Sequence, residues 1–475
     1  MQELKQQAHK LEIQSKFEDA LKIYHKLIKE NISDATNYNA VGVIFYKMGR
    51  FKDSIDAFKE ALSLDNNYAE AFSNLGAIHA KFKNYDLAIS LYKKAISIKP
   101  KYAGAYTNLG NSLNKINEHE DAVHFHKIAI SLDNKSANNF ANCATSYKLL
   151  GRYDKAESLY KKALSIDPSH VNAHFDLATV LLQQSKNIEG LKEYEWRFKK
   201  DEMRGHLIKY KNIFNKNLYQ GQDLQNKTIL VHTEQGFGDS IMVARYLHVL
   251  KNKGAKVIIY LRKELKNLFA ELGCVDEVIV RDEPIPEIDY QLPMMSLPIV
   301  CDPNLGKLKD NYPYIKTKDK FDLDSNKFKI GIVWGASNSG DSYKNKVFSL
   351  KYFEQLSKNP KVTLYSLQLG EDKKDILKYN MQEDIVDMSI YIDNFLDTAK
   401  IINSLDLVIT SDTSVAHLAG AMGANVWVVL QKVPDWRWGI DNDISQWYPS
   451  AKLFRQNSLG DFNSAFTKVY GALNV

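Results

Sequence analysis

A short glycine-containing segment holds the first residues that could do chemistry. It reads Glu234-Gln235-Gly236-Phe237-Gly238-Asp239-Ser240, directly after an apolar run and directly before a helical pattern. Its two glycines permit a tight turn and a close approach of the backbone to a ligand. Asp239 either caps the start of the helix or points into a cleft as a general base. The spacing leaves both interpretations open.

A second segment, Thr410–Gly423, places hydroxyl groups, a carboxylate and a histidine at the start of another helical pattern. Backbone N–H and hydroxyl groups at a helix start favour an anion such as a diphosphate. An ordinary capped helix with a buried histidine explains the pattern equally well. The candidate ligand-binding residues here are Ser411, Asp412, Thr413, Ser414, Val415 and His417.

Two further loops follow apolar runs in the same part of the chain. One begins at Trp334-Gly335 and leads to Lys344 and Lys346, which could clamp phosphate oxygens or could simply be solvated. The other, Pro434–Gly439 followed by Trp447-Tyr448, is rich in aromatic residues. Aromatic faces stack on sugars and bases and Arg437 could meet a phosphate, whereas a hydrophobic lid is the plainer interpretation.

Alternating strands and helices are expected to position these loops. Short β-rich runs are interspersed with amphipathic stretches, which indicates βαβ units and a parallel sheet. The runs are Thr228–His232, Val257–Leu261, Glu277–Val280, Lys329–Trp334, Val362–Leu367, Leu405–Thr410 and Val426–Leu430. We predict two Rossmann-like halves, residues 227–322 and 323–475, joined by the charged stretch 316–327, with a cleft at the carboxyl ends of the strands.

The first two hundred residues repeat with a period of 34 residues, as in Gly42, Gly76 and Gly110. Small residues in two columns let paired helices approach closely, and an aromatic column fills the groove to the next repeat. The aromatic column is Tyr24, Phe58, Tyr92, His126, Tyr160 and Tyr194. Six helix pairs are predicted from positions 1, 35, 69, 103, 137 and 171, followed by a linker over residues 201–226. We interpret His126 as a packed variant rather than a ligand.

Composition describes an ordinary globular chain of 475 residues with 44% hydrophobic residues. The net charge of +6 is spread along the sequence, which argues against a nucleic-acid partner. Three widely spaced cysteines favour a reducing compartment, and no leader or apolar run of roughly 18 residues is visible. We therefore expect a cytoplasmic protein without a membrane span; the oligomeric state is left open.

The repeats resemble the tetratricopeptide (TPR) family, with Met48-Gly49-Arg50-Phe51 and Leu150-Gly151-Arg152-Tyr153 as matching loops. The second half resembles glycosyltransferase family 9, the heptosyltransferase-like family with a GT-B fold. The resemblance rests on Gln235–Asp239 with Ala244–Leu247, Ser296–Pro298, Tyr312–Tyr314, Ser411–Gly423, Asp435–Gly439 and Trp447–Pro449. The closest resemblance is to bacterial proteins that carry such repeats ahead of such a domain.

This resemblance implies inverting sugar transfer without a required metal. It implies that Asp239 is the base, and that the nucleotide diphosphate of the donor sugar sits against Thr413, Ser414 and His417. The Asp441-Asn442-Asp443 triplet, which matches a metal motif of other glycosyltransferases, is interpreted as coincidence because it lies away from a strand end. No cofactor is expected beyond the nucleotide-sugar substrate.

The concave face of the repeats is expected to bind a protein or peptide, so the acceptor would be a protein or a glycan. A passive spacer is the alternative for the repeats. The architecture also resembles O-linked N-acetylglucosamine transferases. Two alternatives to transfer stay open: a non-catalytic TPR adaptor with a degenerate α/β module, and an epimerase of the same fold.

Overall fold

The computed structural model describes residues 1–306, 310–323, 326–336, 346–440 and 442–473. They form two compact units, Met1–Leu177 and Ala178–Val475. The boundary therefore falls inside the sixth helix pair rather than at residue 200. The second helix of the last repeat belongs with the α/β part of the chain. In the described part of the chain no helix is long and apolar enough to cross a membrane.

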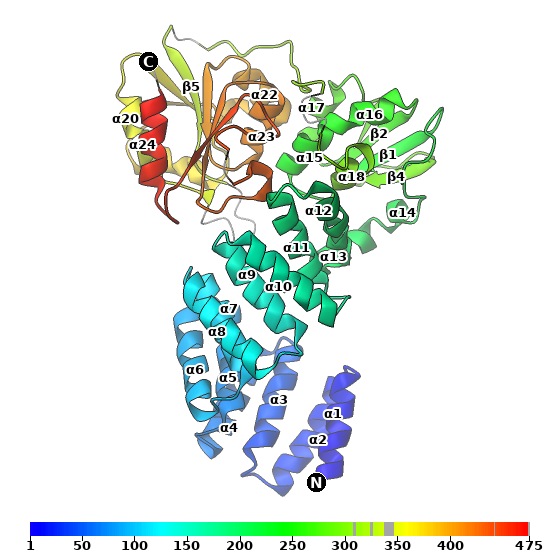
Figure 1. Cartoon of the computed structure of the whole chain (residues 1–475), viewed down its shortest axis with the longest axis vertical. Helices are drawn as coiled ribbons and strands as arrows, with labels where there is room; N and C mark the ends of the chain where they lie inside the picture. Colours follow the sequence, from blue (N-terminus) through cyan, green and yellow to red (C-terminus); the bar gives the residue numbers. More distant parts are fainter. Residues whose placement is uncertain (307–309, 324–325, 337–345, 441, 474–475) are drawn as a thin grey trace. The chain divides into compact units, whose positions relative to one another are not determined.

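The first unit consists of antiparallel helix pairs that follow one another along the array (Figure 1). The predicted repeat starts at 35, 69, 103, 137 and 171 coincide with the first residues of α3, α5, α7, α9 and α11. The pairs are α1 (Gln2–Ile13) and α2 (Phe17–Glu30), α3 (Ala35–Lys47) and α4 (Phe51–Leu64), α5 (Ala69–Lys81) and α6 (Tyr85–Ile98), α7 (Ala103–Lys115) and α8 (His119–Leu132), and α9 (Ala137–Leu149) and α10 (Tyr153–Ile166). The sixth pair, α11 (Val171–Gln183) and α12 (Asn187–Tyr194), crosses into the second unit.

The glycine and aromatic columns meet as their spacing predicts. A Cβ on Gly42 would lie 2.5 Å from the Phe58 ring, and one on Gly110 would lie 2.6 Å from the His126 ring. Phe58 also packs with Leu75 and Ile78 of the following repeat. Tyr24 and Tyr92 lie in clusters of the same kind with residues of the repeat that follows them, which makes the array cooperative between neighbours.

One turn position has a left-handed backbone in every repeat. The φ angle is positive at Ser15, Gly49, Lys83, Asn117, Gly151 and Ser185, which recur every 34 residues. Only two of these positions carry glycine, the residue for which that conformation costs nothing. The turn is therefore imposed by the packing of the helices on either side rather than by local preference alone.

The second unit contains two parallel sheets, each covered by helices. The first sheet has the order β3-β2-β1-β4, built from β1 (Thr228–His232), β2 (Lys256–Leu261), β3 (Glu277–Val280) and β4 (Tyr290–Pro293). We call this sheet with its helices the first lobe. Its helices include α15 (Phe237–Val243), α16 (Leu247–Asn252), α17 (Lys266–Ala270) and α18 (Leu297–Cys301).

The segment 201–226 is not the linker that the sequence predicts. It forms α13 (Asp201–Lys209) and α14 (Lys211–Phe214). Tyr210 and Ile213 pack against Leu230, Ile258 and Ile279 of the first sheet. The prediction was wrong because these scattered apolar residues lack a long periodic pattern, yet they supply the layer that the short first lobe needs on one face.

The second lobe has a six-stranded parallel sheet of order β10-β9-β8-β5-β6-β7. Its strands are β5 (Phe328–Val333), β6 (Val362–Ser366), β7 (Ile385–Asp387), β8 (Leu407–Thr410), β9 (Val426–Leu430) and β10 (Ala451–Arg455). Helices α20 (Glu354–Ser357) and α24 (Phe462–Ala472) lie on one face and α22 (Phe395–Ile402) and α23 (Ser414–Ala421) on the other (Figure 1). This is a doubly wound arrangement, and ligands of such sheets bind at the carboxyl ends of the strands.

Replacing His126 by phenylalanine should stabilise the repeat array and make it less sensitive to acid. His126 is fully buried and neither ring nitrogen has a hydrogen-bond partner in the described part of the chain, whereas Phe58 fills the equivalent place without polar atoms. Removing the unpaired nitrogens should raise the free energy of unfolding by about 1–3 kcal/mol. Burial lowers the pKa of His126 from 6.5 to about 4.

Native His126 therefore stays neutral while the unfolded chain takes up a proton, so stability is lost as the pH falls from about 6.5 towards 4. The loss is at most about 1.4 kcal/mol per pH unit. Urea unfolding followed by far-UV circular dichroism at pH 7 and pH 5 measures it. Because all six tryptophans lie at or after Trp196, their fluorescence monitors the second unit as a control. Equal pH dependence in the variant and the parent would contradict the assignment.

Candidate functional site

The glycine loop of the first lobe connects β1 to α15. Gly236 is the N-cap residue of α15, and Asp239 Oδ2 accepts a hydrogen bond from the Gly236 N–H at 3.0 Å. One oxygen of Asp239 thus caps the helix, as the plainer interpretation of the sequence expects. The other oxygen remains available to a partner outside the lobe.

The matching loop of the second lobe connects β8 to α23. Thr413 is the N-cap residue of α23, and its hydroxyl lies 3.0 Å from that of Thr410 rather than on the helix backbone. Ser411 is buried and donates to the carbonyl of Gly335 at 3.3 Å. The start of α23 is therefore not capped by a side chain of its own.

These two loops meet each other. A Cβ on Gly238 would lie 2.6 Å from Cδ2 of His417, so only glycine allows α15 to approach α23 this closely. Arg437 Nη2 lies 2.5 Å from Asp239 Oδ1 and joins the same two lobes by an ion pair. The carboxylate and the histidine that the sequence singles out separately are thus brought to one junction.

Three carboxylates and two cations form one set of ion pairs around Asp239. Arg437 Nη1 also contacts Asp435 at 2.6 Å, and Lys346 lies 2.6 Å from Asp412. Burial alone would raise the pKa of Asp435, but Arg437 and Lys346 outweigh it and hold that pKa at about 2. Three carboxylates therefore share two cations, and Arg437 is divided between Asp239 and Asp435.

His417 is a neutral member of this site. Burial lowers its pKa to about 4, its Nδ1 lies 2.8 Å from the Tyr448 hydroxyl, and its ring stacks on Trp438 at 4.9 Å between centroids. Trp438 in turn donates its indole N–H to Asp412 at 2.7 Å. The histidine can offer a hydrogen bond to a ligand but carries no charge to attract one at neutral pH.

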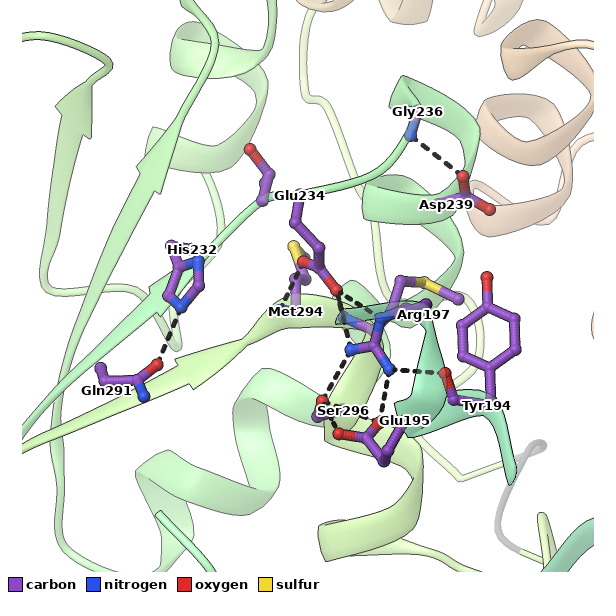
Figure 2. Close-up of polar contacts among 12 residues, drawn as sticks. Tyr194, Glu195, Arg197, His232, Glu234, Gly236, Asp239, Gln291, Met294 and Ser296 are labelled. Carbon is purple, nitrogen blue, oxygen red and sulfur yellow. Dashed lines mark hydrogen bonds and ion pairs between the residues drawn. The ribbon is translucent and has the colours of Figure 1, made fainter. Parts of the chain in front are cut away.

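A buried ion pair holds the glycine loop in place (Figure 2). Arg197, which is 1% exposed, lies in the 3-10 segment Glu195–Lys199 that follows the last repeat. Its Nη2 lies 3.0 Å from Glu234 Oε1, and the backbone N–H groups of Met294 and Met295 donate to the same carboxylate. Burial raises the pKa of Glu234, and the charge and hydrogen bonds of Arg197 oppose that rise.

Ser296 and Glu195 complete this cluster. Ser296 accepts from Arg197 Nη2 at 2.7 Å, and its hydroxyl donates to Glu195. The cluster joins three segments, the end of the repeats, the β1–α15 loop and the loop after β4. Sequence reasoning noted Ser296 but missed its contacts with Arg197 and Glu195, because an arginine and a glutamate 37 positions apart, Arg197 and Glu234, offer no local signal.

Other motif residues serve the lobe junction structurally. Arg245 is buried, donates to the Trp447 carbonyl at 2.7 Å and lies over the Tyr314 ring. Tyr314 donates to the Ile241 carbonyl at 3.1 Å. The segments Ala244–Leu247, Tyr312–Tyr314 and Trp447–Pro449 thus pack the two lobes together.

The remaining predicted residues divide into three groups. Gly335 lies at the end of β5 and donates its N–H to Gln368 at 2.8 Å, while a Cβ there would collide with Asp372. The side chains of Gln235, Ser414 and Val415 are partly buried and make no hydrogen bond within the described residues; Phe237 lies under Arg262 at 3.5 Å. Lys344 and Asp441 lie outside the described residues. Among the residues that are described, no group of three metal-binding side chains occurs.

Comparison with known proteins supports the assignment of repeats in the first half of the chain. A TPR repeat model matches residues 42–81. One tetratricopeptide repeat model matches residues 69–102 and 138–170, and a second matches residues 91–124 and 159–192. The N-terminal helix pairs are therefore tetratricopeptide repeats, as the sequence predicts. Such repeats form protein-interaction modules.

Protein FlbA of Caulobacter vibrioides is 23% identical over 350 residues, which cover 63% of this chain and 54% of FlbA. The chain thus spans about half the length of this curated relative. Among solved structures, MamA is 25% identical, with 34% of this chain and 94% of MamA covered and a TM-score of 0.30. YrrB, a TPR protein with an unusual peptide-binding site, is 18% identical, with 40% and 97% covered and a TM-score of 0.31.

The Arg197–Glu234 pair should behave as one energetic unit. Replacing Arg197 by methionine leaves a buried carboxylate without its cation and should cost about 3–5 kcal/mol of unfolding free energy. Replacing Glu234 by glutamine should cost less, because Arg197 keeps its ion pair with Glu195 at 2.5 Å. The double variant should lose less than the sum of the two, because no buried carboxylate is then left without Arg197.

Urea unfolding of the second unit, followed by tryptophan fluorescence, measures the stability of the parent chain, the two single variants and the double variant. Arg204→Met on the exposed side of α13 is the matched control and should change stability by less than about 0.5 kcal/mol. Strict additivity of the two single substitutions would show that the pair does not couple the repeat end to the glycine loop.

Proposed function

We propose that this chain is a glycosyltransferase that moves a sugar from a nucleotide-diphosphate sugar to an acceptor recruited by its tetratricopeptide repeats. The observation that carries the proposal is the ion pair of Asp239 with Arg437 at the lobe junction, beside the close approach of Gly238 to His417 of α23. A base on one lobe and anion-binding groups on the other are what a displacement at a sugar carbon requires. The resemblance to glycosyltransferase family 9 supports the same assignment.

The reaction would be a single displacement at the anomeric carbon. The acceptor oxygen forms the new bond to that carbon while its proton passes to Asp239. The bond from the anomeric carbon to the diphosphate oxygen breaks, and the diphosphate leaves with the electron pair. General-base help of this kind contributes about 10²–10⁴-fold to the rate.

Arg437 would change partners during this cycle. Both oxygens of Asp239 are occupied, one by Arg437 and one by the Gly236 N–H, so neither is free to accept a proton from an acceptor hydroxyl in this arrangement. A bound diphosphate offers Arg437 a more highly charged partner. Transfer of the guanidinium from Asp239 to the diphosphate would free the base only when the donor is present and would stabilise the leaving group.

The neutral His417 would contribute a hydrogen bond rather than charge. Its ring is fixed between Trp438 and Tyr448, so it costs little to position. A cavity of about 230 Å³ lies beside Trp438 and is lined largely by amides and hydroxyls, among them Gln183, Ser185 and Gln446. These groups suit the hydroxyls of a sugar or the amides of a peptide.

The repeats would recruit a protein or peptide acceptor, because tetratricopeptide arrays are protein-interaction modules. The tail of the sixth repeat is part of the same compact unit as the α/β lobes. Tyr194 packs on Trp436 at 6.2 Å between ring centroids, which joins the end of the array to the aromatic loop of the second lobe. An acceptor held by the last repeat would therefore reach the lobes directly.

A non-catalytic adaptor is the second candidate. The pairing of Asp239 and Asp435 with Arg437 is compatible with it, since a structural ion-pair network would contain the same contacts. In that case the lobes would bind a partner or nucleotide without turnover. Turnover and nucleotide binding separate the two candidates.

Asp239→Asn should remove most of the sugar transfer or nucleotide-sugar hydrolysis, by about 10²–10⁴-fold, while leaving the fold intact. The amide keeps the cap to Gly236 but cannot accept the proton. Release of nucleoside diphosphate from UDP-, GDP- and ADP-sugars measures the rate. Asp322→Asn, at an exposed position, is the control. A variant with a near-normal rate would eliminate Asp239 as the base.

The same Asp239→Asn variant should bind nucleoside diphosphates at least as tightly as the parent chain. The substitution removes the carboxylate that competes with the diphosphate for Arg437. Thermal unfolding with UDP, GDP, ADP, CDP and CMP, followed by tryptophan fluorescence, measures the effect. Absence of any shift with all five nucleotides would count against a donor site and favour the adaptor.

A further inference from the structure

Three neighbouring strands of the first lobe end in residues that sequence reasoning did not single out. Thr233, Arg262 and Arg281 come directly after β1, β2 and β3. These strands are adjacent and parallel, with Leu261 opposite Val280 in the register. The Arg281 N–H donates to the Leu261 carbonyl at 2.8 Å, so the register continues past the strand ends. The two arginines are therefore cross-strand neighbours.

These two arginines bring like charges together at the ends of neighbouring strands. Within the described residues neither guanidinium has an ion-pair partner, and the Arg281 Nε is buried without a hydrogen bond. Burial and the charge of Arg281 lower the pKa of Arg262, outweighing Glu264 and Asp239, which act in the opposite direction. Like charges placed opposite each other on neighbouring strands are destabilising.

Both side chains are nevertheless held in place. Arg262 lies over the Phe237 ring at 3.5 Å, and Phe237 itself contacts Phe395 of the second lobe at 5.0 Å. Arg281 donates to the carbonyl of Thr233 and to its hydroxyl at 3.3 Å. Two anchored cations at the carboxyl ends of parallel strands, beside the glycine loop, form a preorganised site.

We propose that Arg262 and Arg281 bind an oxyanion, the carboxylate or phosphate of a substrate, next to Asp239. The planar guanidinium matches both groups by paired hydrogen bonds, and an arriving anion would relieve the repulsion between the two arginines. Arg262 lies over Phe237, which is two residues before Asp239 in α15, so an anion at Arg262 would lie near the proposed base. The binding site itself does not depend on sugar transfer; only the identification of its ligand as a substrate rests on the proposed function.

Binding to the full chain tests this site. Inorganic phosphate, glucose 6-phosphate and glucuronate are the oxyanion probes and glucose is the neutral probe, titrated by calorimetry and by thermal unfolding at constant ionic strength. The oxyanions should bind and stabilise the second unit, and glucose should not. Arg262→Gln should weaken oxyanion binding at least tenfold, whereas Arg204→Gln on exposed α13 should leave it unchanged.

The unliganded Arg262→Gln chain should be at least as stable as the parent, because it loses a like-charge contact. If this substitution weakens the binding of nucleoside diphosphates as well, the oxyanion belongs to the donor. If it weakens only the binding of the sugar acid and the phosphates, the oxyanion belongs to the acceptor. Equal binding of glucose and glucose 6-phosphate, or unchanged oxyanion binding in Arg262→Gln, would overturn the proposal. Neither result would affect the test of Asp239, which measures turnover.

Discussion

The buried contact between Arg197 and Glu234 is the interaction on which the site depends. Removing two charges from water is costly, and the cost is offset here because the carboxylate also accepts from the Met294 and Met295 backbone while Arg197 donates to Ser296. Those bonds fix the chain between β1 and α15. The position of Asp239, five residues further on, follows from this anchor. The end of the repeats thereby sets the geometry of a loop in the first lobe.

The second constraint is the sharing of Arg437 between two carboxylates. A single guanidinium bonded to both Asp239 and Asp435 joins the lobes, and a competing anion must take it from at least one of them. The close approach of Gly238 to His417 allows no side chain between α15 and α23 at this point. Asp239 can hold the lobes together through Arg437 or it can accept a proton, but the same oxygen cannot do both. Release of Arg437 to a ligand would therefore also loosen the junction.

The repeats could be predicted from the sequence almost to the residue, because one packing rule recurs every 34 positions and leaves a periodic signal. The long apolar strands could be predicted as well, whereas β4, β7 and β10 were missed, being short or mixed in composition. The helices of residues 201–214 were missed because only their tertiary contacts make them a layer. The candidate residues could be found, but not their partners: nothing local pairs Asp239 with Arg437, 198 positions away. Glycosyltransferase activity stays a prediction.

The charges at the junction suggest how the two lobes divide the recognition of an anionic substrate. The second lobe and the glycine loop together hold three carboxylates against two cations, while the strand ends of the first lobe hold Arg262 and Arg281 with no ion-pair partner in the described chain. In the proposed function, an anion at Arg262 and Arg281 would displace no ion pair, whereas a diphosphate would have to compete with Asp239 for Arg437. That competition would release Asp239 from its ion pair. The costlier of the two proposed binding events would therefore be the one that frees the proposed base.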